Sequence, residues 1–196
     1  MNMSTHVANI SKACFMQLRN LWSIKKFVDS DTLLTLTHAF VTSKLDYGNA
    51  LLYGIPKNTM SRLQYVQNCA ARLIRGARKF DHVTPLLIDL HWLPMTYRPM
   101  FKILLTVFKI LQGRAPEYLT ELVTMYNPGR SLRSNGNLIL NVPRSNTKSW
   151  GDRAFSIAGP RLWNSLPIEL RATTNIEEFK SRLKTHLFNM AFEGYL

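Results

Sequence analysis

Acidic residues, cysteines and long apolar runs are all scarce in this sequence of 196 residues. Aspartate and glutamate total 12 against 25 lysines and arginines, so the formal net charge is +13 at pH 7. The two cysteines, Cys14 and Cys69, do not form a cluster with zinc spacing, and each falls in a helical pattern typical of a reduced core cysteine. The best candidate for a membrane span, residues 101–111, is broken by two lysines.

The N-terminal residues lack the order of a secretory signal, in which basic, apolar and small residues follow one another. We therefore expect an intracellular protein, in the nucleus or the cytoplasm, with no membrane partner. Because no cluster of histidines and cysteines has ligand spacing, we also expect no metal and no cofactor.

Motifs for catalysis are missing as well. No glycine-rich loop of the Walker or dinucleotide type is present. Asp81, His82 and His91 can be interpreted as an acid–base set. We favour a structural interpretation, in which Asp81 caps the following helix and His91 packs beside Trp92. We expect no catalytic residues.

The positive charge points to a polyanionic partner, with nucleic acid as the first candidate and an anionic membrane surface as the second. A hydrophobic content of 46% is ordinary for a globular protein, so global disorder is not expected. Ten basic residues and two acidic residues fall between Lys57 and Arg114, which makes this section the most positive.

Three amphipathic patterns in the first part predict helices over residues 4–28, 32–53 and 59–75, with residues 29–32 as a turn and N-cap. Short turns join them, so we expect a three-helix bundle over residues 1–76. The residues predicted to face its core are Ile10, Ala13, Cys14, Leu18, Leu21, Trp22 and Ile24, then Leu33, Leu34, Leu36, Phe40, Val41 and Leu45, then Leu63, Val66, Ala70, Leu73 and Ile74.

A central helical segment is predicted over residues 77–126. Its main helix, Tyr97 to Leu111, is apolar nearly all round, which is typical of a helix inside a fold. Only a narrow stripe made by Arg98, Lys102, Thr106 and Lys109 is polar.

Residues 127–196 are predicted to form an α+β extension. Alternating residues over 138–142 indicate a short strand, returning as a hairpin through residues 148–150. A helix is expected over 152–163 with a break at Gly159-Pro160, and a last helix begins with a capping box of Thr174 and Glu177. The fold class is therefore mainly α: a three-helix bundle followed by a helical domain with a small β-hairpin.

Four blocks of the sequence carry a resemblance to a known family. They are Lys79–Pro85 with Leu90–Pro94 and Tyr97-Arg98, then Ser43–Pro56, Leu63–Leu73, and Gly151–Phe155 with Gly159–Pro167. Together they resemble the C-terminal region of LINE-type (non-LTR, jockey-like) retrotransposon polyproteins. The blocks keep the order of that family and cover most of the chain.

The resemblance implies the part of a reverse transcriptase that follows its catalytic palm, namely a thumb of three helices and a C-terminal extension. The paired aspartates that hold two metal ions would then belong to a palm N-terminal to Met1. No two aspartates are adjacent in this chain, so we expect it to have no polymerase activity by itself. The zinc knuckle of some related enzymes is not present, so that contact cannot be carried over.

Phosphate contact is the function that the remaining residues favour, because lysines and arginines at helical spacing can follow a nucleic-acid backbone. The candidate contact residues are Gln64, Asn68, Arg72, Arg75, Arg78, Lys79, Arg98, Lys102 and Lys109. A second candidate patch consists of Arg130, Arg133, Arg144, Lys148 and Arg153.

We thus expect a fragment that grips an RNA–DNA or DNA duplex without sequence preference, next to the remainder of the retrotransposon polyprotein. One alternative is a decayed or captured element copy that serves as a protein-interaction module or has no function. A small hydrolase that uses Asp81, His82 and His91 is the last-ranked alternative.

Overall fold

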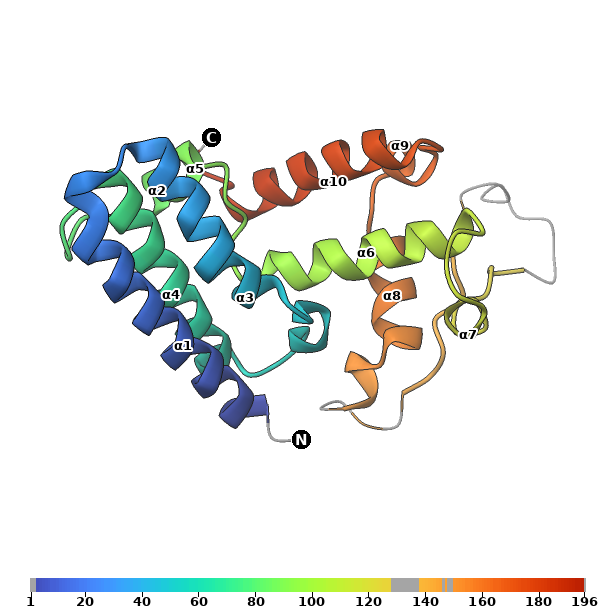
Figure 1. Cartoon of the computed structure of the whole chain (residues 1–196). Helices are drawn as coiled ribbons and strands as arrows, with labels where there is room; N and C mark the ends of the chain where they lie inside the picture. The colour runs from blue at the N-terminus through green and yellow to red at the C-terminus, as the bar shows by residue number, and fades with distance from the viewer. Residues whose placement is uncertain (1–2, 128–137, 146, 148–149, 196) are drawn as a thin grey trace. The chain divides into compact units, whose positions relative to one another are not determined.

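The structure is a computed structural model that describes residues 3–127, 138–145, 147 and 150–195 (Figure 1). The described residues are mainly helical, which confirms the predicted fold class, and they contain no β-strand. The chain divides into two compact units: Met1–Pro99 with Met190–Leu196, and Met100–Asn189.

The first unit holds the three predicted helices, which pack on one another. Helix α1 spans Met3–Ile24 and packs against α4, which spans Lys57–Arg75. The middle helix is built from α2 (Ser30–Thr37), a π-helical turn (His38–Thr42) and α3 (Ser43–Asp46). The short helix α5 (Thr84–Asp89) follows α4.

The buried stripe of α1 is narrower than the sequence predicts. Its buried residues are spaced by three and four positions, as in a two-helix seam: Val7, Ser11, Cys14, Leu18 and Leu21. Trp22 and Ile24 were expected in the core but are 63% and 38% exposed. Phe40 of the middle helix is likewise exposed, whereas Leu33, Val41 and Leu45 are buried as predicted. Helix α1 and the middle helix thus carry more large apolar side chains than the neighbouring helices bury.

The middle helix ends at Asp46, seven residues before the predicted end at Tyr53. Gly48 there adopts a φ of +60°, and a 3₁₀ turn over Asn49–Leu52 follows. The Asn49 amide donates to the Asp46 carboxylate at 3.0 Å, which closes this turn. At the other end the predicted cap is confirmed, because Asp29 accepts a hydrogen bond from the Thr32 backbone N–H at 2.7 Å. That bond lowers the pKa of Asp29.

His91 ends helix α5 rather than lying in a packed position. Its φ is +51°, its N–H donates to the carbonyl of Ile88, and the next N–H, of Trp92, donates to that of Leu87. This pair of bonds is the Schellman pattern for a residue just past a helix end. His91 is exposed, whereas the adjacent Trp92 is buried.

Asp81 does not cap α5, as the sequence had predicted. Its carboxylate accepts the backbone N–H of Arg78 at 2.6 Å, and its own N–H donates back to the Arg78 carbonyl. It therefore closes the turn after α4, whereas α5 begins with Pro85 in its first turn and has no side-chain cap.

The second unit contains most of α6 (Tyr97–Leu111), then α7 (Glu117–Thr120), α8 (Phe155–Asn164), α9 (Ile168–Arg171) and α10 (Ile176–Ala191). Its core forms where α6, α8 and α10 contact one another. Phe108 of α6 stacks on Phe179 of α10 with ring centroids 4.2 Å apart, and Trp163 of α8 lies 5.9 Å from Phe179.

The predicted hairpin is not confirmed. Leu140 instead forms an isolated antiparallel bridge with Met125, and residues 146, 148 and 149 of the expected return lie outside the described residues. The Asn164 side chain both donates to the carbonyl and accepts from the N–H of Leu140, each at 2.8 Å. The bridge to Met125 and the Asn164 side-chain amide thus supply the pairing that a returning strand was expected to give.

The expected break at Gly159-Pro160 is also wrong, because α8 continues through it to Asn164. A Cβ at position 159 would lie 3.0 Å from Cγ2 of Val107 in α6. The glycine therefore permits a close approach of two helices, and Pro160 is buried within α8.

The cap of α10 is Asn175 and not Thr174. The Asn175 side-chain oxygen accepts from the backbone N–H groups of Glu177 and Glu178, at 2.8 and 3.2 Å. The predicted apolar row is confirmed for Phe179, Leu183 and Leu187, all of which are buried.

Loss of this cap gives a first testable prediction. We expect Asn175→Ala to lower the free energy of unfolding by about 1 kcal/mol, because two N–H groups at the helix start lose their acceptor. Thr174→Ala is the matched control and should change the stability by less than about 0.5 kcal/mol. Urea unfolding followed by circular dichroism measures both, and equal losses for the two variants would contradict the assignment.

Candidate nucleic-acid interface

Two of the nine candidate contact residues, Gln64 and Asn68, take part in a hydrogen-bond network inside the first unit. The Gln64 amide donates to Gln67 at 3.0 Å and to Asn68 at 2.8 Å, and its oxygen accepts the backbone N–H of Met95 at 2.8 Å. Gln67 is 1% exposed and donates to the carbonyl of Leu93. The Gln64 amide is therefore used in holding the turn before α6 against α4.

Arg98 belongs to the same network. Its Nη1 contacts both carboxylate oxygens of Asp46 at 3.0 Å, and its Nε donates to the carbonyl of Leu93 at 2.9 Å. Only 11% of the Arg98 side chain is exposed. Arg98 thus binds partners within the first unit. Phosphate contact would require its guanidinium to face solvent.

Arg72 and Arg75 each have a partner at the end of α4. Arg72 Nη2 donates to the carbonyl of Asp81 at 3.0 Å, while its buried Nε has no hydrogen-bond partner. Arg75 forms an ion pair with Asp89, with both side chains largely in solvent. Such an exposed pair is weak, so the Arg75 charge is only partly neutralised.

Arg78 and Lys79 are exposed and form no ion pair within the described part of the chain. Two lysines that the sequence analysis did not select lie near them. A Cβ on Gly76, at the end of α4, would lie 3.5 Å from Nζ of Lys25, which follows the end of α1. Lys25, Lys26, Arg78 and Lys79 are called the terminal basic surface below.

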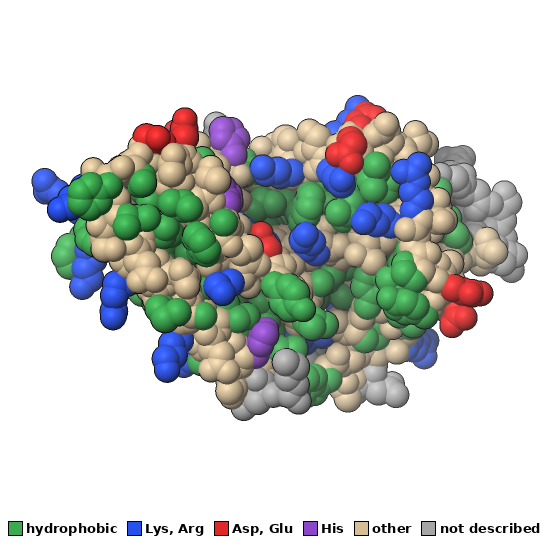
Figure 2. Space-filling model, in the orientation of Figure 1, with side chains coloured by type: hydrophobic (Ala, Val, Ile, Leu, Met, Phe, Trp, Pro, Cys, Tyr) green, Lys and Arg blue, Asp and Glu red, His purple; other side chains and the backbone are tan. Residues whose placement is uncertain are grey.

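The positive charge of the terminal basic surface is stabilised because the surface lies at two helix C-termini. Helices α1 and α4 both end there, and the carbonyl end of a helix carries a partial negative charge that stabilises nearby cations. Figure 2 shows exposed hydrophobic side chains over α1 and α2, with lysine and arginine side chains beside them. A groove lined by aromatic rings and cations adjoins the terminal basic surface.

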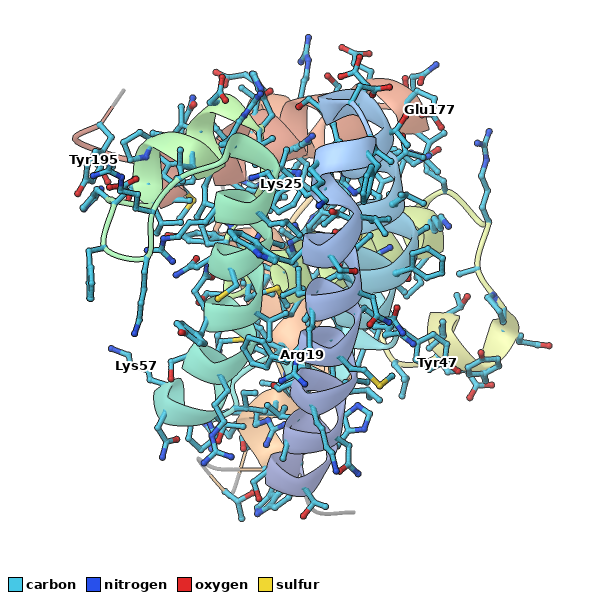
Figure 3. The ribbon with its side chains drawn as sticks, turned by 60° about the vertical axis from the view of Figure 1, so that its left-hand side comes forward. Arg19, Lys25, Tyr47, Lys57, Glu177 and Tyr195 are labelled. Carbon is cyan, nitrogen blue, oxygen red and sulfur yellow. The ribbon has the colours of Figure 1, made fainter. Side chains whose placement is uncertain are left out.

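The groove lies between α1 and α4 and has a volume of about 610 Å³. Four aromatic side chains line it: Phe15, Trp22, Tyr65 and Phe80. Figure 3 shows the two helices side by side, with Arg19 labelled on α1 and Lys57 on α4. Phe15 and Tyr65 meet between the helices with ring centroids 5.7 Å apart.

Three cations and no acidic residue line the same groove. They are Arg19 on α1, Arg72 on α4 and Lys79 after α4. The Lys79 ammonium lies over the Phe80 ring at 5.4 Å, and Lys25 lies over the Trp22 ring at 5.3 Å. Two rings of the groove thus already form cation–π contacts.

Cys69 also lines this groove, which corrects its predicted place in the core. Burial raises the pKa of its thiol, so at neutral pH the group is protonated and a weak nucleophile. Cys14 is buried as predicted, and burial raises its pKa to about 11.

The remaining candidates lie in the second unit. Lys102 is exposed and Lys109 half-buried, and neither forms an ion pair within the described ranges. Of the second candidate patch, Arg130, Arg133 and Lys148 lie outside the described residues. Arg144 is exposed, and Arg153 lies over the Trp150 ring at 5.4 Å.

No group of three or more histidines, cysteines and acids is placed to hold a metal ion within the described residues. None of the described helices combines the length and the apolarity needed to cross a membrane.

Comparison with known proteins found no matching family model, no matching curated protein and no matching solved structure.

Proposed function

We propose that this chain grips nucleic acid through its backbone phosphates and serves as the thumb and extension of a retrotransposon reverse transcriptase. The family resemblance stated above supports the second half of this proposal. The first half rests on one observation: four cations that form no ion pair within the described residues lie together where α1 and α4 end. Polymerase activity is not proposed for the chain alone, because it has no adjacent aspartates.

The partner that fits the terminal basic surface is the phosphate backbone of an RNA–DNA or DNA duplex. Lysine and arginine side chains in solvent bind phosphates by releasing counterions, and such contacts carry no sequence information. The proposed contact set is therefore Lys25, Lys26, Arg78 and Lys79, with Arg75 at its edge. Lys102 and Lys109 stay in the proposal as contacts of the second unit.

The test is a salt titration of duplex binding by the full chain. We expect one variant with four changes, Lys25→Gln, Lys26→Gln, Arg78→Gln and Lys79→Gln, to bind duplex with a weaker salt dependence. The negative slope of log affinity against log salt should become less steep. The decrease should approach about 0.9 per lost contact on B-form DNA. Fluorescence anisotropy of a labelled duplex measures the slope.

The control variant removes the same charge elsewhere in the first unit. Lys12, Lys44, Lys57 and Arg62 are exposed and lie outside the terminal basic surface, and all four are changed to Gln. This variant should keep most of the wild-type slope. Equal slopes for the two variants would mean that net charge alone drives binding, and no binding by the wild-type chain would overturn the proposed function.

A protein-interaction module is the second candidate function. It is favoured by the number of large apolar side chains in solvent, among them Phe27, Tyr47 and Phe80, which are 76%, 82% and 90% exposed. In that case the terminal basic surface variant would bind duplex as its control does.

A further inference from the structure

We propose that the groove between α1 and α4 holds unpaired bases of a single-stranded nucleic acid, which stack on its aromatic rings while the cations hold the adjoining phosphates. This inference rests on the proposed function and adds a second binding element to it, which shares Lys79 with the terminal basic surface. The terminal basic surface contacts phosphates of any strand, whereas the groove requires bases that are free to leave a stack.

The rings and cations of the groove share one face of each helix. Phe15, Arg19 and Trp22 lie at i, i+4 and i+7, so they share one face of α1. Tyr65 and Arg72 lie at i and i+7 on the facing side of α4. Each helix therefore presents an aromatic ring and a cation to the same groove.

Three of the four aromatic rings of the groove are more than half exposed. Trp22, Tyr65 and Phe80 are 63%, 52% and 90% exposed, so much of each ring is in solvent and can meet a flat ligand. Lysine side chains lie over one face of Trp22 and one face of Phe80. Burying such rings in a protein core would be more favourable than leaving them in water. Stacking of bases on aromatic side chains covers them, and it tolerates any sequence because every base has a π-face.

The polar side chains of the groove complement the phosphates of a nucleic-acid strand. The lining holds three cations and no acid, which matches a chain of phosphates. The Arg72 guanidinium lines the groove and is held in place by a hydrogen bond from its Nη2 to the carbonyl of Asp81. Asn68 also lines the groove; its oxygen is used by Gln64, which leaves its N–H groups for a base or phosphate oxygen.

A duplex does not fit this lining, because its bases are stacked inside and only phosphates and groove edges are presented. The volume of about 610 Å³ is within the usual range of about 300–1,000 Å³ for sites that enclose a ligand. An acidic amphipathic peptide shares the charge of the strand but not its flat rings, and the experiment therefore separates these two occupants.

The experiment compares four probes for binding to the full chain: a labelled single strand of about 12 nucleotides, the same strand without bases, a matched duplex, and an acidic amphipathic peptide. The test variant is Trp22→Ala with Tyr65→Ala and Phe80→Ala. The control variant, Phe40→Ala with Tyr47→Ala and Tyr118→Ala, removes three exposed rings outside the groove.

We expect the groove variant to bind the single strand about 10- to 100-fold more weakly than the wild-type chain. Its affinity for the duplex and for the strand without bases should stay within about twofold, and the control variant should bind all probes normally. A Trp22→Phe variant should keep the single-strand affinity, because a ring is retained, and lose the quenching of Trp22 fluorescence on binding.

Three results would overturn the inference. Equal binding of strands with and without bases would exclude stacking, and single-strand affinity unchanged in the groove variant would exclude these rings. Loss of peptide binding only, in that variant, would assign the groove to a protein partner. In each case duplex binding through the terminal basic surface would persist, whereas failure of every nucleic-acid probe would overturn the proposed function as well.

Discussion

Arg98→Ala is expected to lower the free energy of unfolding by about 2–3 kcal/mol. The change removes two contacts to the Asp46 carboxylate and the hydrogen bond to the Leu93 carbonyl. It also leaves a partly buried carboxylate without its counter-charge, which costs more than the pair itself contributes. Asp46 is 35% exposed, so water reduces the penalty below that of a fully buried pair.

Two controls separate this effect from the loss of a positive charge. Lys102→Ala, four residues further along the same helix, removes an exposed lysine and should change the stability by less than about 0.5 kcal/mol. Arg98→Lys keeps the charge but cannot contact both oxygens and the carbonyl, so most of the loss should remain. Chemical denaturation of each variant measures the difference, and a loss from Arg98→Ala no larger than that from Lys102→Ala would refute the structural role.

The position of Arg98 shows why the candidate interface was only partly predictable. In sequence it belongs to a basic stripe with Lys102 and Lys109, and nothing local distinguishes it from them. Its partner Asp46 is 52 residues away, and a pairing over that distance leaves no periodic signal. The same holds for Gln64, whose partner Met95 comes from the turn before α6.

Helices were more predictable, because their signals are local. The cap at the start of α2, the end of α4 at Arg75 and the buried row of α10 were predicted from a cap residue and from three-to-four spacing. The predicted hairpin failed for the opposite reason. The alternating residues around Leu140 were real, but they pair with residues 124–126 on one side and with the Asn164 side chain on the other. No sequence pattern predicts either contact.

The groove was missed because apolar residues on a helix are read as core. Trp22 falls close to the stripe of Leu18 and Leu21, and only the packing shows that most of its side chain stays in solvent. One signal was available: Lys25 and Lys26 stand between two aromatic residues, and Lys79 precedes Phe80. Alternation of cations and rings is typical of single-strand binding and could have been weighed against burial.

The internal network also gives a structural meaning to the residues that carry the family resemblance. Asp46 and Asn49 come from one block, Gln64 and Gln67 from another, and Leu93 and Arg98 from a third. In the structure they form one connected set of hydrogen bonds. These residues therefore hold α3, α4 and the start of α6 together.

Phe179→Ala is expected to have the largest effect on stability, a loss of about 3–5 kcal/mol. The side chain is fully buried, stacks on Phe108 and lies beside Trp163, so its removal leaves a cavity among two large rings. Both neighbours come from other helices of the second unit, which limits how far the cavity can close. Phe179→Leu retains most of the volume and should lose about 1 kcal/mol.

Tyr118→Ala serves as the matched control, because it removes an aromatic ring that is 68% exposed in the same unit. Its effect should stay within about 0.5 kcal/mol. Urea unfolding followed by circular dichroism ranks the three variants, and the order alanine, leucine, control is what cavity formation requires. If Phe179→Ala and Phe179→Leu lost the same stability, restoring most of the side-chain volume would recover nothing. A cavity would then not explain the loss, and the assignment of α6, α8 and α10 to one core around Phe179 would be wrong.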